Sequence, residues 1–438
     1  MKHCHCSDRS SEGALELRAA SLPSHGDSSR NQPISKHHRN ITVGILGGSI
    51  SCGWGVGGPG VFGPSKASSY PQLLDTLPWL RVVNRAMRAT GAMIPSLCLS
   101  AMLRNEEVDA VVLEYALNDG VLDGTGKSIA ANQLVSISPE ATMERLLRAI
   151  RLTFPRAVPI ILYVCSPMLK ANAKCEGMYS SVAAHYNVTE LSIRRSSCPE
   201  TAPCPRGSSC DGGFCCNLAW SDNATQDHPQ SSGHVLIAQM IEQQLLSVAA
   251  QDVTDAVAVL PAPLLLDGVE TGTYKCRMCT DRHLCRLLQP HHIDGFALEQ
   301  AHGFRAYGSS QPALSTHKYG LSSRRENATI SFDVPGRSNV MIAMLCSYEH
   351  MGAVALRIYP KAVQLTDIHA QRISLEWRNV SLTWRSKSSQ QCFLELRTAE
   401  GAHVLEARVI SQTGQVKIFG IFTQSRGPEN DSRSKRRT

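Results

Sequence analysis

The feature that most limits the possible folds is an alternation of short apolar runs with amphipathic segments in the first half of the chain. Runs of this length that are almost wholly aliphatic are typical of strands buried on both faces of a parallel sheet. A helix is expected between the third and fourth runs, because apolar side chains recur there at helical spacing. The four runs are 41–46, 80–84, 108–115 and 158–164, and the helical segments are 139–154 and 232–249.

Strands that alternate with helices predict βα units and a parallel sheet covered on both faces. The pattern changes after residue 250, where Pro261 and Pro263 mark a linker and short alternating strands follow, which predicts a β-sandwich. We expect a leader at 1–39, an α/β domain at 40–250 with a cysteine-rich insertion at 196–217, a linker at 251–270, a β-rich accessory domain at 271–424 and a basic tail at 425–438.

Composition agrees with a chain of globular domains. The 438 residues suggest two or three units, and 42% hydrophobic against 18% charged residues argues against a mainly disordered chain. The formal net charge is +7, and much of it lies in 36–39 and 433–437. Basic tails without aromatic residues beside them favour solvated ends over a nucleic-acid-binding surface, so no nucleic-acid partner is expected.

Cysteine usage indicates an oxidising compartment. There are 16 cysteines, and five of them fall between 198 and 216, a density typical of disulfide-rich secreted proteins. Six glycosylation sequons, at Asn40, Asn187, Asn223, Asn327, Asn379 and Asn430, point the same way. We expect a secreted or endomembrane-lumenal glycoprotein, although the first forty residues contain no apolar signal-peptide core and no stretch could span a bilayer. A structural zinc ion is a less favoured alternative to disulfides for one group of possible ligands, which are Cys276, Cys279, His283 and Cys285.

Three groups with catalytic potential follow the expected strands. Ser49 comes after two glycines at the end of the first strand, where the backbone can turn sharply and expose a hydroxyl. Asn118 follows the third strand, at the edge where α/β proteins bind ligands, and its amide can donate to an oxyanion. His228 precedes the last helix.

Four segments of the chain resemble, in their order, the four blocks of the SGNH/GDSL esterase-lipase superfamily in its Gly-Gly-Ser variant. They are the Gly-Gly-Ser turn, an Asn-x-Ala segment from Asn84, Asn118-Asp119, and His228-Pro229-x-x-x-Gly233-His234. The resemblance covers about residues 40–250 and implies a three-layer α/β/α, flavodoxin-like domain. The segment 347–352 is similar to part of the β-rich tail of some eukaryotic proteins of this type.

The resemblance implies a role for each block. Ser49 would attack the acyl carbonyl and His228 would act as base. The backbone N–H groups of Ser49 and Ala89 and the side chain of Asn118 would hold the oxyanion, with Gly91 as the fallback for Ala89. No metal or organic cofactor is implied.

Two positions depart from the family pattern. Alanine stands at Ala89 where glycine is usual, and it can serve only if its backbone conformation allows. Thr225 occupies the position of the usual acid, which leaves Asp227, Asp222 or a backbone carbonyl to orient His228. Adjacent side chains on an extended segment point in opposite directions, so Asp227 requires a tight turn.

The sequence therefore predicts a serine esterase that removes or transfers an O-acyl group, with an acylated small molecule or a glycan of a polysaccharide or glycoprotein as substrate. The alternative is a non-catalytic glycan-binding protein on the same scaffold, and the distance between Ser49 and His228 discriminates between the two. Trp377 and Trp384 are expected either in the sandwich core or as stacking platforms for a glycan. The sequence indicates no oligomeric state.

Overall fold

The computed structural model describes residues 39–54, 56, 69–104, 106–120, 138–165, 175–197, 228–250, 260–265, 284–287, 301–307, 320–346, 350–361, 377–383 and 390–425. The expected leader, the cysteine cluster, Asp222, Asp227, Trp384, the basic tail and most of the possible zinc ligands lie outside these residues.

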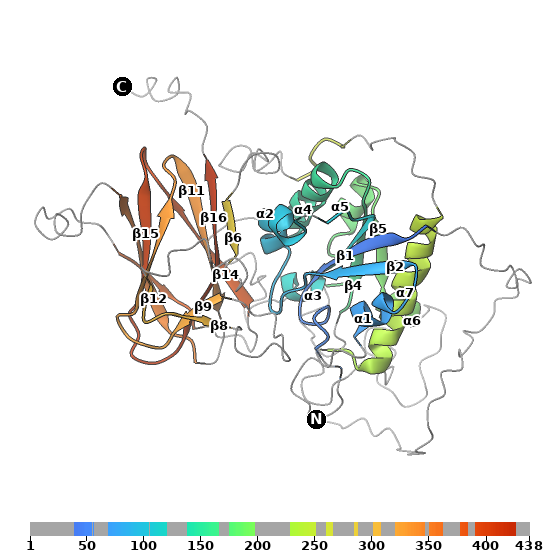
Figure 1. Ribbon diagram of the computed structural model, residues 1–438, viewed down its shortest axis with the longest axis horizontal. Coiled ribbons are helices and arrows are strands. Elements are labelled where there is room, and N and C mark those ends of the chain that lie inside the picture. Colours follow the sequence, from blue (N-terminus) through green and yellow to red (C-terminus); the bar gives the residue numbers. More distant parts are fainter. Residues whose placement is uncertain are drawn as a thin grey trace, which may run out of the picture.

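The first domain is built on a five-stranded sheet in which every neighbouring pair is parallel (Figure 1). The strand order β2-β1-β3-β4-β5 is the flavodoxin-like order, which reverses direction between β1 and β3. The four predicted strands are confirmed, and β5 is an additional edge strand. The bounds are β1 Ile41–Gly47, β2 Leu80–Asn84, β3 Ala110–Glu114, β4 Val158–Tyr163 and β5 Thr189–Ser192.

Helices cover both faces of this sheet, which confirms the three-layer α/β/α architecture. On one face, α1 (Tyr70–Asp75) and α7 (Ser231–Ala249) share a buried core with one set of strand side chains. On the other face lie α2 (Met93–Met102), α4 (Pro139–Thr153) and α5 (Ser180–His185). Two short helices, α3 (Ala116–Asp119) and α6 (Ile193–Ser197), follow β3 and β5.

The α4 helix shows how local sequence produces an element of this core. The Ser138 side chain caps its N-terminus by accepting from the Ala141 N–H at 3.1 Å, and Pro139 occupies the first turn. The predicted apolar face is fully buried: Met143, Leu146, Leu147 and Ile150 are all 0% exposed.

The second domain consists of two packed antiparallel sheets, so the predicted β-rich domain is confirmed (Figure 1). The strand orders are β13-β12-β15-β10-β7 and β14-β11-β16-β9-β8, with β6 paired to β16. The bounds are β6 Leu284–Leu287, β7 Ala301–His302, β8 Arg305–Tyr307, β9 Gly320–Ser323, β10 Thr329–Val334, β11 Ser338–Cys346, β12 Ala353–Pro360, β13 Arg378–Ser381, β14 Gln390–Arg397, β15 His403–Val409 and β16 Val416–Ser425.

The sheet that contains β11 is covered on both faces. All nine residues of β11 are buried, whereas a sandwich strand ordinarily alternates buried and exposed positions. The additional cover comes from the first domain, because α2 lies against β6 and its side chains belong to the same buried cluster as the strands of the sandwich (Figure 1). The two domains therefore share one continuous apolar core.

The linker is held against the first domain by polar contacts. Glu144, which is 0% exposed, accepts the backbone N–H groups of Leu264 at 2.5 Å and Leu265 at 2.7 Å. Arg148 donates to the Pro261 carbonyl at 2.7 Å. These bonds fix the path of the chain between the two domains.

Trp377 is not in the core of the sandwich, and its expected role as a stacking platform for a glycan stays a prediction. It is half-buried on the outer side of the sandwich, with the guanidinium groups of Arg357 and Arg408 at 4.2 and 4.3 Å from its ring centroid. The prediction that Trp377 is a core residue is therefore wrong, because two arginines on neighbouring strands provide a cation–π platform outside the core.

Among the described residues, Cys165 pairs with Cys175 and Cys346 with Cys392, as expected for an oxidising compartment. In the same part of the chain, no helix combines the length and apolar character needed to cross a membrane.

Candidate active site

The turn after β1 carries the predicted nucleophile, and its two glycines are required by close contacts. A Cβ on Gly47 would lie 2.2 Å from the Ser51 hydroxyl, and one on Gly48 would lie 2.1 Å from the Asn118 side-chain amide. Neither separation is possible for a real side chain. The Gly-Gly pair therefore lets neighbouring side chains pack directly onto the backbone that presents Ser49.

The structure brings the predicted nucleophile and base into hydrogen-bond contact. The Ser49 Oγ lies 2.7 Å from the His228 Nε2, across 179 residues of sequence. The Trp54 ring meets the His228 imidazole edge-on, with centroids 6.3 Å apart. This separation is within the range that proton transfer from a serine to a histidine requires.

Asn118 reaches the same point from β3. It lies in α3, directly after that strand, and its amide lies over the backbone of Gly48, one residue before Ser49. The Ser49 turn and α3 follow β1 and β3, between which the sheet order reverses. Ligands of open α/β sheets bind at such switch points, where the loops diverge and leave a crevice.

Ala89 has a left-handed backbone conformation of the kind that favours glycine. Its φ is 57°. This left-handed conformation raises the free energy of an alanine by roughly 1–2 kcal/mol and that of a glycine by almost nothing. Gly91, the fallback, packs against a carboxylate instead, since a Cβ there would lie 1.9 Å from the Asp119 Oδ1.

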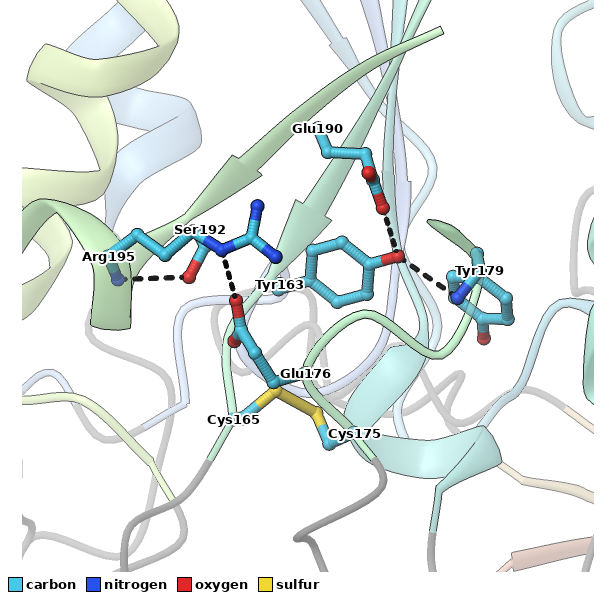
Figure 2. The surroundings of a disulfide bond; sticks show 8 residues. All are labelled: Tyr163, Cys165, Cys175, Glu176, Tyr179, Glu190, Ser192 and Arg195. Atoms are coloured by element: carbon cyan, nitrogen blue, oxygen red, sulfur yellow. Dashed lines mark hydrogen bonds and ion pairs between the residues drawn. A yellow bond between two sulfur atoms is a disulfide. The ribbon is translucent and has the colours of Figure 1, made fainter. Parts of the chain in front are cut away.

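Asp119 braces the segment that carries Asn118. Its carboxylate is buried and accepts hydrogen bonds from the Ala92 N–H at 3.2 Å and from the Tyr179 hydroxyl at 2.6 Å. Burial raises the pKa of Asp119 to about 6. Figure 2 shows the Tyr163 hydroxyl between Glu190 and Tyr179, and the Tyr179 N–H donates to that hydroxyl at 3.0 Å. Tyr163 thus anchors the tyrosine that holds Asp119.

A buried carboxyl below the nucleophile was missed by the sequence analysis. Glu114, 1% exposed, accepts from the Gly48 N–H at 3.1 Å and from the Ser51 hydroxyl at 3.0 Å. The Ser51 Oγ also lies 2.6 Å from the Tyr70 hydroxyl. Burial, opposed in part by these hydrogen bonds, raises the pKa of Glu114 to about 7. The sequence feature that could have pointed to this buried carboxyl is a charged residue at the end of an otherwise aliphatic strand.

His234, the second histidine of the last block, has a structural role. It is 0% exposed, its Nδ1 accepts the Tyr70 N–H at 3.2 Å, and its Nε2 lies 3.4 Å from the Trp54 carbonyl. Burial lowers its pKa to about 4, so it is neutral at pH 7 with its proton on Nε2. It therefore ties α7 to the loop that follows the nucleophile.

A hydroxyl bonded to an imidazole, with a carboxamide beside the nucleophile turn, is an arrangement suited to acyl transfer through a covalent intermediate. The candidates for the acid, Asp222 and Asp227, lie outside the described residues.

Comparisons with known proteins support the fold. No family model matches the sequence, and no curated protein matches it. Among solved structures, a two-domain esterase active on acetylated mannans is similar over 88% of this chain and 92% of its own, at 16% identity and a TM-score of 0.56. The same esterase co-crystallised with mannopentaose gives a TM-score of 0.55 over 89% and 92% of the two chains, also at 16% identity.

A member of the G-D-S-L family of lipolytic proteins from Desulfitobacterium hafniense covers 47% of this chain and 99% of its own, at 16% identity and a TM-score of 0.34. The two-domain likeness spans both the parallel sheet and the β-sandwich. The chain therefore shares the fold of the two-domain esterase, with a flavodoxin-like α/β domain followed by a β-rich second domain.

Proposed function

We propose that this protein is a serine esterase that removes an O-acyl group from a polysaccharide or the glycan of a glycoprotein, in an oxidising compartment. The observation that carries the proposal is the 2.7 Å contact between the Ser49 Oγ and the His228 Nε2. A glycan-binding protein without activity has no need of this contact. The likeness to an esterase active on acetylated mannans favours an acetylated glycan as substrate.

In the proposed reaction, the Ser49 Oγ attacks the acyl carbonyl while the His228 Nε2 takes the hydroxyl proton. The backbone N–H groups of Ser49 and Ala89 and the Asn118 amide donate to the oxyanion. The proton on His228 then passes to the departing alcohol. Water, deprotonated by His228, then attacks the acyl-enzyme, and His228 returns the proton to the departing Ser49 Oγ as the acid is released. An acceptor alcohol in place of water would give acyl transfer.

Hydrolysis of 4-nitrophenyl acetate and release of acetate from acetylated glucomannan test the proposal. Ser49→Ala is expected to lower kcat at least about 10³-fold on both substrates, since residual activity would come only from binding and the oxyanion donors. Ser331→Ala, on β10 of the second domain, is the matched control and should retain full activity. Equal turnover by wild type and Ser49→Ala would refute the nucleophile.

The residue that orients His228 is tested by Asp222→Asn and Asp227→Asn. Loss of the orienting carboxylate is expected to lower kcat by about 10²–10⁴-fold with little change in KM. The variant with that loss identifies the acid, and full activity in both variants assigns the role to a backbone carbonyl.

A further inference from the structure

An aromatic and basic cluster lies on the outer face of the second domain. The Trp377 ring contacts the guanidinium groups of Arg357 on β12 and Arg408 on β15, whose Cζ atoms lie 4.2 and 4.3 Å from the ring centroid. The chain neighbours Leu356 and Ala407 belong to the buried core. Because successive side chains of a strand point to opposite faces, the two arginines project outward, and they hold Trp377 on the outside of the sandwich.

Asn379 lies on the same outer face, two residues after Trp377. It pairs with Ala355 of β12, and Ala355 in turn pairs with Arg408 of β15. Directly opposite residues of antiparallel strands share one face of a sheet, so Asn379 and Arg408 point to the same side. Asn379 is exposed, and no described residue forms a hydrogen bond with its side chain.

The sequence around Asn379 is a glycosylation sequon with an aromatic residue before it. Asn379, Val380 and Ser381 form one of the six sequons of the chain, and among the six it alone has Trp, Tyr or Phe two residues before the asparagine. β13 begins at Arg378, and alternate residues of an extended segment lie on one face. A sugar attached to the Asn379 amide would therefore emerge beside the Trp377 ring.

The cluster offers a sugar both kinds of contact that it can make. One face of N-acetylglucosamine carries C–H groups, which pack against the apolar body of an aromatic ring. Its hydroxyl and acetamide oxygens accept hydrogen bonds from N–H donors. Arg357 already donates to Glu406, whereas no described residue accepts a hydrogen bond from the Arg408 guanidinium. A partly buried donor without an acceptor is a cost that a sugar oxygen beside it would relieve.

The strand that carries Asn379 is also one that benefits from cover. β13 is the edge strand of its sheet, and both Arg378 and Asn379 are exposed. Edge strands present unpaired N–H and C=O groups to other chains, and natural proteins commonly cover or charge them. A glycan on Asn379 would keep two molecules from pairing along this edge.

We propose that Asn379 is N-glycosylated and that the first sugar of its glycan packs on Trp377 and Arg408. In this modification, the Asn379 amide nitrogen forms a bond to C1 of an N-acetylglucosamine oligosaccharide, which a host enzyme transfers from a lipid pyrophosphate donor. The bond between C1 and the pyrophosphate oxygen breaks, the lipid pyrophosphate leaves with the electron pair, and the amide loses one proton. The inference does not rest on the proposed esterase activity.

Modification is tested on the full chain secreted from a eukaryotic host. Enzymatic removal of glycans in water enriched in heavy oxygen converts each occupied asparagine into a labelled aspartate, which mass spectrometry of the digested protein locates. Asn379 is expected to be labelled in most molecules. An unlabelled Asn379, whatever the state of the other sequons, would overturn the proposal. Asn379→Gln should leave the kcat for 4-nitrophenyl acetate at the wild-type value.

The packing of the first sugar is tested by thermal denaturation of the glycosylated proteins. Asn379→Gln is expected to lower the Tm by about 2 °C, the shift that a contact of modest strength gives in a protein of this size. In the Trp377→Ala background the same substitution should no longer lower the Tm, because the contact is already lost. An equal loss in both backgrounds would refute the packing. Made in a host without N-glycosylation, wild type and Asn379→Gln should have the same Tm.

Asn327→Gly is the matched control, because it removes another exposed sequon on the same sheet, at a φ of 61° that glycine adopts freely. Its effect on the Tm should be the same with and without Trp377. If Trp377→Ala fails to fold, NMR of wild type with a labelled glycan decides. The first sugar on Asn379 should then show signals shifted to high field by the ring current of Trp377, and the shifts of a free glycan would overturn the packing.

Discussion

Glu114→Gln should change how the stability of this protein depends on pH. The carboxyl is fully buried below the nucleophile turn, where it accepts from the Gly48 N–H and the Ser51 hydroxyl. Its pKa rises from 4.5 to about 7, with burial as the main cause and the nearby Asp119 as a smaller one. A glutamine has the same shape, accepts the same two bonds through its carbonyl, and carries no charge at any pH.

The sign follows from proton binding. Because the folded state holds the Glu114 proton more tightly than the unfolded state, stability from this group is fully present below about pH 4.5 and is lost as the pH rises to about 7. At about 1.4 kcal/mol for each tenfold change in proton affinity, the full loss is about 3 kcal/mol. Between pH 5 and pH 8, wild type should therefore lose about 2–3 kcal/mol that Glu114→Gln retains.

Urea denaturation of both proteins at pH 5 and pH 8 measures the effect. The two free energies of unfolding should be close at pH 5, and the variant should be more stable by about 2–3 kcal/mol at pH 8. Glu326→Gln, which removes an exposed carboxylate, controls for the change in net charge. A difference between wild type and Glu114→Gln that is the same at both pH values would refute the reasoning.

Three further predictions concern the turn and its supports. Gly48→Ala should lower kcat for 4-nitrophenyl acetate about 100-fold with little change in KM, because the new methyl group would displace the Asn118 amide. An unchanged kcat would contradict the close contact. Ala89→Gly should keep full activity and leave the free energy of unfolding equal or up to about 1 kcal/mol higher, because the relief of left-handed strain is offset by the greater chain entropy of glycine in the unfolded state. A clearly lower free energy of unfolding in urea denaturation would contradict this prediction. Replacing both Cys165 and Cys175 with serine should lower that free energy by about 3 kcal/mol, the entropy of a short closed loop, and an unchanged denaturation midpoint would show that the crosslink contributes nothing.

The sequence was sufficient for elements whose burial follows a clear apolar pattern. β1, β3 and β4 are mostly aliphatic and mostly buried, and α4 has an apolar face that is buried. β5 was missed because its four residues, Thr-Glu-Leu-Ser, form no apolar run at the sheet edge. The short α1 was missed because its six residues are too few to establish a helical period.

The candidate site divides in a similar way. The contact between Ser49 and His228 was expected only from the resemblance of the four ordered blocks to the SGNH/GDSL superfamily. The hydrogen bonds of Glu114 and the stacking of Arg88 on Trp54 did not follow, because they depend on the approach of distant segments. No spacing rule relates such residues along the chain.

The shared apolar core has a consequence for dissection of the protein. Cutting the chain after α7 would expose the side of α2 that now lies against the sandwich, and would leave the Glu144 carboxylate without the two linker N–H groups it accepts. Neither fragment would be a self-sufficient module, so we expect the halves to melt in a single cooperative transition and each to aggregate when expressed alone. Transplanting the sandwich onto another enzyme would require a new partner surface for β11.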